Sequence, residues 1–446
     1  MFIQQTRLFL ELVVKCAPIK LWTSVSQGRP MPRVGGTLRH LETDREAIGP
    51  GPNRGMLATV NDRPHLRKPP EATGRLGWAL AAVGCAGALA AALLSPNDAR
   101  SAAAQDWSPF VLVAGLLLVG LVADEDRLFS AAGHALARLA PNGLVLYIGA
   151  VVLIVSVTTV LNLDTSVAFL TPILVYTARN RGEGEAPFLY GCLLLSNAGS
   201  LLLPGSNLTN LIVLGHLHLS GGQFLRHMAP AAIAAALVTA LVVGGAEHRS
   251  LRATVAPVSD LERPVLGVGL IAMGAVIVLV LVLRSPAAPV AAVGVVAAVV
   301  RTLSSVVSPR RALGVLGLPV LVGLFGVAVA LGTLGRAWSG PADLLSHLDS
   351  WGTAGAGAFF SVVVNNLPAA SLLAARVPPR PFALLVGLNI GPNLFFSGSL
   401  AWLLWLRSAK SAGARPSIAK ASLLGVVAAP LSMAAALGML ALNGSH

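Results

Sequence analysis

The chain has 446 residues, of which 55% are hydrophobic and 11% are charged, and its formal net charge is +13. Soluble domains carry about 25% charged residues, so this chain has too few charges to cover the surface of a soluble protein of its length. The composition therefore excludes a water-soluble globular protein and indicates an integral membrane protein. In such a protein a basic excess is typical of cytoplasmic loops, and it does not indicate a nucleic-acid partner.

Residues 1–75 differ from the rest of the chain. They are rich in Pro, Gly and Arg, and the stretch from Arg29 to Pro70 has no apolar periodicity. We expect residues 1–75 to form a basic, disordered arm in the cytoplasm. Translation from Met56 is an alternative that the sequence leaves open.

The membrane part begins near Leu76 and contains long runs without charge. Each run has about the 20 residues that a helix needs to cross the hydrocarbon core of a bilayer. Helices are expected because each backbone polar group in lipid must be paired within its own segment. We therefore expect an all-α polytopic membrane protein with about 11 transmembrane segments. The clearest runs are Leu76–Pro96, Trp107–Ala123, Gly143–Val160 and Val265–Leu283.

Charged stretches mark the expected water-exposed loops. The stretch 407–420 carries four basic residues and no acid, so we expect it in the cytoplasm. One apolar span follows it, which puts the C-terminus outside, whereas the basic arm keeps the N-terminus inside. The expected loops are residues 124–138, 179–185, 247–263, 301–311, 336–349 and 407–420.

A connecting loop at residues 247–264 divides the membrane part into a first repeat, 76–246, and a second repeat, 265–446. Each half contains an Asn-rich interruption, then Asn-x-Gly, then a Gly-Ser pair within apolar sequence. Paired Gly- and Pro-interrupted segments at matching positions are the best sequence pointer to a transporter's binding site. We expect the two repeats to be inverted relative to each other.

The candidate substrate- or ion-binding residues lie beside these interruptions. A broken helix in a membrane exposes backbone polar groups and positive helix N-termini, which suit a small oxyanion, an oxyacid or a cation with oxygen ligands. The alternative is that the side chains form hydrogen bonds between helices and bind nothing. The candidates are Asn162, Asp164, Thr165, Ser206, Asn207, Asn210, Asn365, Asn366, Asn389, Asn393 and Ser399.

Asp164 is the only acid in the apolar stretch Gly143–Ala178. An ionisable residue within a membrane segment is a functional candidate by default, and we expect Asp164 to carry a proton or bind a cation. The alternative is that Asp164 caps the helix that follows the interruption.

No catalytic site, metal site or cofactor is expected. The three cysteines, Cys16, Cys85 and Cys192, are far apart and have no metal-ligand or disulfide spacing. The sequence contains no Walker motif, so the chain does not itself use ATP through such a site. The protein is therefore expected to be a transporter and not an enzyme.

The interrupted segments at residues 162–172, 200–210, 365–368 and 391–406 resemble those of the arsenite efflux permease family. This family is part of the ion transporter superfamily, which also contains sodium/dicarboxylate and citrate carriers. The resemblance runs from about Leu76 to the C-terminus. It implies a bacterial inner-membrane carrier with two inverted repeats, each with a re-entrant hairpin and an unwound helix. The implied activity is export of arsenite or antimonite in exchange for protons, in some members with a separate ATPase subunit.

Two positions depart from the family pattern. Family members often carry Asp where Asn389 stands and Lys where Asn393 stands, so Asp164 remains as the main acid candidate. The Ser-Asn-Thr repeats of the sodium/dicarboxylate branch are absent, which argues against sodium-coupled carboxylate uptake.

We therefore expect a secondary transporter that exports arsenite or antimonite with protons as the coupling ion. Because three separated cysteines do not make a three-thiol site, arsenite would be carried as the neutral trihydroxide, hydrogen-bonded by Asn and Ser. The alternatives are a carrier of another small anion, such as a dicarboxylate, citrate or sulfate, a passive anion channel, or the membrane subunit of an ATP-driven pump.

Overall fold

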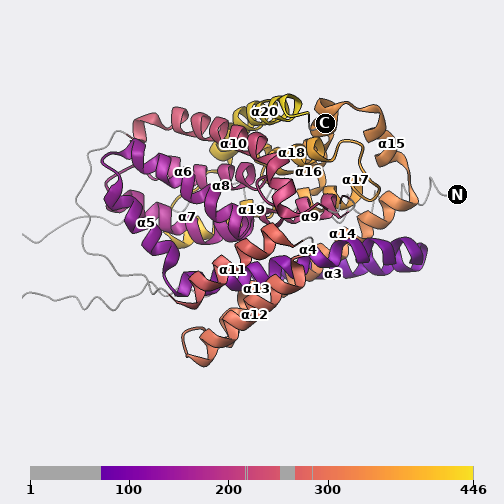
Figure 1. Cartoon of the computed structure of the whole chain (residues 1–446), viewed down its shortest axis with the longest axis horizontal. Helices are drawn as coiled ribbons and strands as arrows, with labels where there is room; N and C mark the ends of the chain where they lie inside the picture. Colours follow the sequence, from indigo (N-terminus) through magenta and orange to yellow (C-terminus); the bar gives the residue numbers. More distant parts are fainter. Residues whose placement is uncertain (1–71, 216, 218, 252–266, 284, 445–446) are drawn as a thin grey trace, which may run out of the picture. The chain divides into compact units, whose positions relative to one another are not determined.

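The computed structural model describes residues 72–215, 217, 219–251, 267–283 and 285–444. Within these residues the regular structure is entirely helical, which confirms the predicted all-α class (Figure 1). Almost all of the expected cytoplasmic arm lies outside the described residues, as does most of the expected connecting loop. Helix α3 already begins at Ala72, so residues 72–75, which we had assigned to the arm, are helical.

The first half of the chain forms helices α3 to α10, followed by two connecting elements. The bounds are α3 Ala72–Leu94, α4 Pro96–Glu125, α5 Leu128–Leu139, α6 Gly143–Val160, α7 Leu163–Asn180, α8 Ala186–Gly199, η1 Pro204–Ser206, α9 Leu208–Leu214, α10 Gly221–Ala246, η2 His248–Leu251 and α11 Val268–Val282.

The second half forms helices α12 to α20. The bounds are α12 Ala287–Leu303, α13 Pro309–Leu316, α14 Leu318–Ala337, α15 Gly340–His347, α16 Ser350–Val364, α17 Asn366–Leu373, α18 Pro381–Ile390, η3 Gly391–Leu394, α19 Ala401–Ser411 and α20 Ile418–Leu442.

Six of the described helical segments are long and apolar enough to cross a membrane, and shorter apolar helices accompany them. Large apolar side chains point outward from them, with Leu93, Leu241 and Ile271 each about three-quarters exposed (74%, 74% and 75%). Outward apolar side chains along such helices fit lipid contact. The long spans are Gly77–Leu94, Pro96–Glu125, Gly143–Val160, Gly221–Ala246, Pro309–Ala337 and Ile418–Leu442, and the shorter helices are Val268–Val282, Ala287–Leu303, Ser350–Val364 and Pro381–Leu394.

Several expected loops contain helices, and this part of the prediction was wrong. Residues 124–138 end α4 and form most of α5, and α13 and α15 lie within or next to the expected loops at 301–311 and 336–349. Charge marked these stretches as polar, but short helices with one polar face satisfy the same charge pattern.

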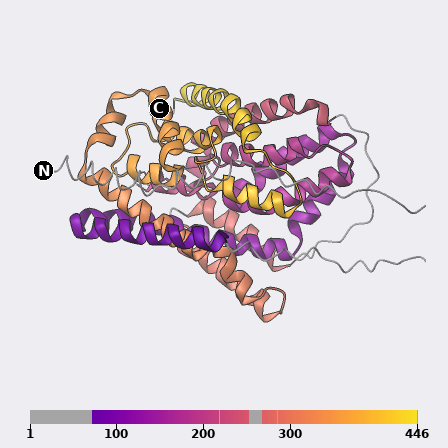
Figure 2. The ribbon, with the colours of Figure 1, turned by 180° about the vertical axis from the view of Figure 1, so that it is seen from behind.

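Glycines allow the long helices to cross at short distance. A Cβ added to Gly84 of α3 would lie 2.1 Å from the backbone oxygen of Gly323 in α14, and one added to Gly294 of α12 would lie 2.4 Å from that of Gly115 in α4. Small residues at such crossings let helix backbones pack closely in a membrane. Both views show α3 in indigo beside α14 in orange (Figures 1 and 2).

The two halves use their elements in the same order. In the first, the short helix α5 precedes a hairpin, α6–α7, a broken helix, α8–η1–α9, and a long helix, α10. In the second, the short helix α15 precedes a hairpin, α16–α17, a broken helix, α18–η3–α19, and a long helix, α20. The predicted helical hairpins and broken helices are thus present in both halves.

Candidate functional site

Each hairpin reverses at an asparagine that caps its second helix. The Asn162 side-chain oxygen accepts a hydrogen bond from the Thr165 backbone N–H at 2.7 Å, and the Asn365 oxygen accepts one from the Leu367 N–H at 3.5 Å. Asn365 has a φ of +79° and a ψ of 148°, close to a region that is otherwise almost restricted to Gly, so the backbone of this turn is strained. The two predicted interruptions are therefore tight turns that Asn side chains stabilise.

A serine from each broken helix is bonded to the first arm of its own hairpin. The Ser206 hydroxyl donates to the Thr159 carbonyl at 3.1 Å, and the Ser397 hydroxyl donates to the Val362 carbonyl at 2.6 Å. Thr159 and Val362 each lie three residues before their hairpin asparagine, so the two contacts are equivalent. Ser397 was not among the candidates, although the Gly-Ser pair that marked Ser206 recurs beside it.

Asn389 is the centre of a hydrogen-bond network between the halves. Its side-chain oxygen accepts from the Asn207 amide at 2.6 Å, the Ser200 hydroxyl at 2.8 Å and the Thr209 hydroxyl at 3.2 Å. Its nitrogen donates to the Asn210 side-chain oxygen and the Leu385 carbonyl, both at 2.8 Å. The structure thus brings together three predicted residues, Asn207, Asn210 and Asn389, and adds two that the prediction omitted.

Asn393 makes the second contact between the halves. Its side-chain oxygen accepts from the Asn197 amide at 2.8 Å, and its nitrogen donates to the Leu194 carbonyl at 3.0 Å. Asn197 belongs to the first Asn-x-Gly motif, as Asn389 belongs to the second, but Asn197 was not among the candidates. At positions 389 and 393 this chain therefore has neutral amides, and both form hydrogen bonds with residues of the first half.

The remaining second-half candidates lie around the hairpin turn. The Asn365 amide donates to the Ser397 carbonyl at 3.2 Å, and the Asn366 backbone N–H donates to the Gly398 carbonyl at 2.9 Å. Ser399 follows directly and is buried, at 3% exposure. These contacts hold the η3–α19 connection against the tip of the second hairpin.

Several buried polar atoms near the breaks have no hydrogen-bond partner among the described residues, and they include Asn162 Nδ2, Thr165 Oγ1, Asn197 Oδ1 and Ser399 Oγ. They come from α7, its cap, α8 and the connection to α19, and α7, α8 and α19 pack against one another. An unpaired buried polar group costs about 1–3 kcal/mol, so a ligand that pairs with these atoms would bind favourably.

Asp164 lies in the first turn of α7 and is half-buried. Asn162, and not Asp164, accepts the capping hydrogen bond, so the alternative that Asp164 caps this helix was wrong. A carboxylate at this position is favoured by the positive end of the helix dipole.

The described residues contain no group of three or more His, Cys, Asp or Glu side chains that could hold a metal ion. Cys85 is exposed on α3 and Cys192 is buried on α8. The candidate site is therefore built from amides, hydroxyls and one carboxylate.

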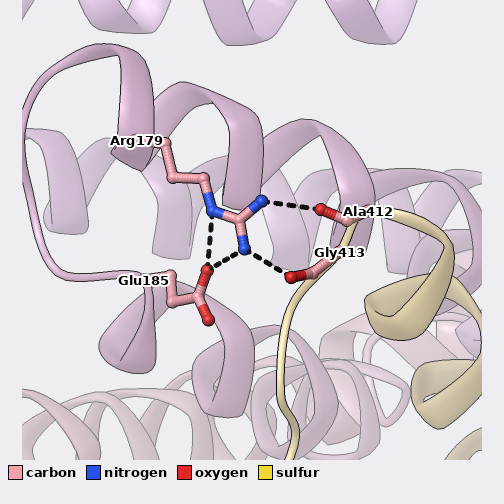
Figure 3. Close-up of polar contacts among 4 residues, drawn as sticks. All are labelled: Arg179, Glu185, Ala412 and Gly413. Carbon is pink, nitrogen blue, oxygen red and sulfur yellow. Dashed lines mark hydrogen bonds and ion pairs between the residues drawn. The ribbon is translucent and has the colours of Figure 1, made fainter. Parts of the chain in front are cut away.

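An arginine joins the base of the first hairpin to the end of α19 (Figure 3). Arg179 donates to the Ala412 carbonyl at 2.7 Å, the Gly413 carbonyl at 3.0 Å and the Glu185 carboxylate at 2.9 Å. The second arm of the first hairpin and the last part of the second broken helix therefore run to the same end of the protein.

Comparison with known proteins places this architecture in a family. A family described as citrate transporter (CitMHS) matches residues 71–406. An Escherichia coli protein named arsenical pump membrane protein is 25% identical over 369 residues, which cover 74% of this chain and 85% of the relative. A Yersinia enterocolitica protein of the same name is 24% identical over 366 residues, with the same coverage of 74% and 85%.

Among solved structures, the Alcanivorax borkumensis YdaH transporter aligns with a TM-score of 0.46 and 16% identity, over 75% of this chain and 85% of that chain. The family match at residues 71–406 covers well over half of the chain and spans both hairpins, the first broken helix and the second as far as the middle of α19. The protein is a multi-pass membrane transporter that belongs to the citrate transporter family CitMHS.

Proposed function

We propose that the protein is a secondary transporter that exports arsenite and antimonite in exchange for protons, and that the substrate binds between the two breaks. The observation that best supports this proposal is the set of buried polar atoms without a partner among the described residues. They belong to Asn162, Thr165, Asn197 and Ser399, which lie at the cap of α7, on α7, on α8 and just before α19. The names of the Escherichia coli and Yersinia enterocolitica relatives favour an arsenical substrate.

The chemistry of the unpaired atoms suits a neutral polyhydroxy substrate. Asn162 Nδ2 is a donor, Asn197 Oδ1 is an acceptor, and the hydroxyls of Thr165 and Ser399 can do either. Arsenous acid carries three hydroxyl groups, each of which can donate and accept. Exposed Cys85 on α3 and buried Cys192 on α8 offer no shared thiol site, so arsenic would bind through its hydroxyl groups.

The helix packing supports inverted repeats, with α3–α10 as the first and α12–α20 as the second. The second hairpin arm α7 packs against α19, and its counterpart α17 packs against α9. Likewise α3 packs against α14 and α4 against α12. Each of these pairs converts into the other when the halves are exchanged, as expected for repeats related by a two-fold axis, inverted repeats included. Alternating access would then follow from motion of one repeat against the other.

Asp164 is our candidate for the residue that carries the coupling proton at the proposed substrate site. It is the only acid among the candidate residues, and in sequence it lies two residues after Asn162 and directly before Thr165, whose Nδ2 and Oγ1 atoms are unpaired among the described residues. Taking up a proton there would let the site exchange a proton for the neutral oxyacid.

The description of the matched family favours a second candidate, a carrier of citrate or another carboxylate. The candidate residues of this chain include no Lys, Arg or His, so they offer no positive side chain to offset a polycarboxylate. The neutral oxyacid is therefore the better match to the site.

The deciding experiment is arsenite and antimonite resistance in a bacterial host that lacks its own efflux pump. Expression of the protein should raise resistance, whereas a variant lacking the second half should not. Everted vesicles should accumulate arsenite, and a protonophore should abolish the accumulation. Accumulation that resists the protonophore but requires ATP would point to a pump subunit, and uptake of citrate without arsenite would favour the second candidate.

A further inference from the structure

A buried carboxylate lies outside the region of the breaks. Asp106 of α4 is 1% exposed, and neither of its oxygens has a hydrogen-bond partner within the described part of the chain. Asp106 lies directly before the apolar run Trp107–Ala123 of α4, a helix long enough to span a membrane. A buried ionisable side chain in such a helix is costly, which makes it a candidate functional group.

A guanidinium is held beside this carboxylate by neutral partners. Arg336 of α14 acts on Asp106 electrostatically, and the Ser371 hydroxyl of α17 lies near it as a hydrogen-bond donor. Arg336 itself donates to the Gly332 carbonyl at 2.9 Å and to the side-chain oxygen of Gln105. The arginine is thus close to Asp106 but hydrogen-bonded elsewhere.

The neighbouring residue Gln105 connects the two halves. Its amide donates at 3.0 Å to the Ile212 carbonyl of α9 and at 3.0 Å to the Ala374 carbonyl at the end of α17. These short helices begin directly after the breaks capped by Asn207 and Asn365. Gln105 therefore links the C-terminal ends of α9 and α17, and Arg336 is hydrogen-bonded to Gln105.

We propose that Asp106 is a second proton-binding site of the transporter, and that its charge controls, through Arg336 and Gln105, whether α9 and α17 are held together. When the carboxyl O–H bond breaks and the proton leaves to water, the new carboxylate attracts the Arg336 guanidinium away from Gln105. When a proton returns, Arg336 returns to Gln105 and the contact is restored. This inference rests on the proposed proton-coupled export.

A proton suits this site better than a metal cation. A cation such as sodium needs several oxygen ligands, but the Gln105 oxygen is already bonded to Arg336. The positive guanidinium beside the carboxylate would also repel a bound cation. A proton needs only one carboxylate oxygen.

Two other charged groups lie near this pair: Asp98 of α4 acts on Arg336 electrostatically, and the Arg376 guanidinium donates to the Arg336 backbone carbonyl at 2.8 Å. Among the described elements that pack against α4, α9, α11 and η1 carry no charged side chain, and the charges of α5, α7, α12 and α13 lie toward the other end of α4. There Arg301 and Arg311 pair with Asp126 and Asp124.

The first test measures proton binding without any substrate. Infrared difference spectra of the purified full-length protein, recorded between acidic and alkaline pH, register carboxyl groups that lose a proton. Asp106→Asn should remove one carboxyl band, whereas Asp343→Asn, which removes an exposed carboxylate on α15, should leave that band in place. An unchanged carboxyl spectrum in Asp106→Asn would overturn the proposal.

The second test measures coupling in proteoliposomes. In Asp106→Asn, arsenite accumulation driven by a pH gradient should fall by at least about tenfold. The rate of arsenite–arsenite exchange should stay within about twofold of the wild-type rate. Equal loss of both activities would show that Asp106 only supports the structure and would overturn the proposal. If wild type moves no arsenite but keeps the Asp106 carboxyl band, the proposed substrate is wrong and the proton site stands.

Discussion

The Asn207 amide donates to the Asn389 side-chain oxygen at 2.6 Å, and this bond joins the first broken helix to the second. We predicted that both residues bind substrate. Every donor and acceptor of the Asn389 amide is already paired within the protein, so a ligand can reach it only by displacing a protein hydrogen bond. We therefore expect Asn389 to hold the two halves in this conformation rather than to contact substrate directly.

Asn389→Asp should destabilise the protein. The new carboxylate oxygen would face the Asn210 side-chain oxygen and the Leu385 carbonyl, both of which now accept hydrogen bonds at 2.8 Å. Loss of two buried hydrogen bonds and burial of a charge should cost about 3 kcal/mol or more. Thermal unfolding of the detergent-solubilised protein measures this cost. The matched control is Asn443→Asp, at the exposed end of α20, and equal melting temperatures for the two variants would refute the expectation.

Ser399→Ala should affect stability and transport in opposite directions. Its hydroxyl is buried without a partner among the described residues, so its removal should stabilise the free protein by up to about 1 kcal/mol. If the same hydroxyl binds the oxyacid, the KM for arsenite should rise by about tenfold.

Ser361→Ala is the control for that experiment, because the Ser361 hydroxyl is buried but donates to the Gly357 carbonyl at 2.8 Å. It should leave the KM for arsenite unchanged. A Ser399→Ala transporter with the wild-type KM would remove Ser399 from the site.

Asp164→Asn should abolish proton-coupled transport. The amide keeps the size of the carboxylate and leaves the Asn162 cap intact, so folding should be preserved. Arsenite accumulation in everted vesicles measures the effect, with Asp343→Asn as a control for loss of an exposed acid. Wild-type accumulation in Asp164→Asn would show that this carboxylate carries no coupling proton.

A cysteine-free variant should retain arsenite transport. Cys85 and Cys192 lie on different helices, one exposed and one buried, and Cys16 lies outside the described residues. Substituting all three with alanine should therefore leave resistance within about twofold of wild type. Loss of transport in a variant that still folds would mean that arsenic binds a thiolate.

Gly84→Val should weaken the crossing of α3 and α14. Even a Cβ at this position would lie 2.1 Å from the Gly323 oxygen, and such overpacking costs about 1–3 kcal/mol. Gly274→Val is the control, since no atom lies within 4 Å of a Cβ built there. Thermal unfolding should separate the two variants, and similar melting temperatures would contradict the close crossing.

The sequence by itself determined that this protein is a helical membrane protein with matching breaks in its two halves. Long apolar runs and the scarcity of charge leave few alternatives, because an unpaired backbone in lipid is too costly. The paired Asn, Gly and Ser signatures located both hairpin turns at Asn162 and Asn365, since those residue types are needed wherever a helix stops and restarts.

Only the tertiary structure decided which polar groups pair across the halves. Ser200 and Thr209 join Asn389, Asn197 joins Asn393, and Gln105 joins α9 to α17 over more than a hundred positions of sequence. Whether two side chains form a hydrogen bond depends on the distance between donor and acceptor to within a few tenths of an ångström. A sequence pattern contains no such distances. For the same reason the sequence did not distinguish Asp106, an acid at the start of an apolar run. Our proposal that it binds a proton depends on its burial and on Arg336 beside it in the folded protein.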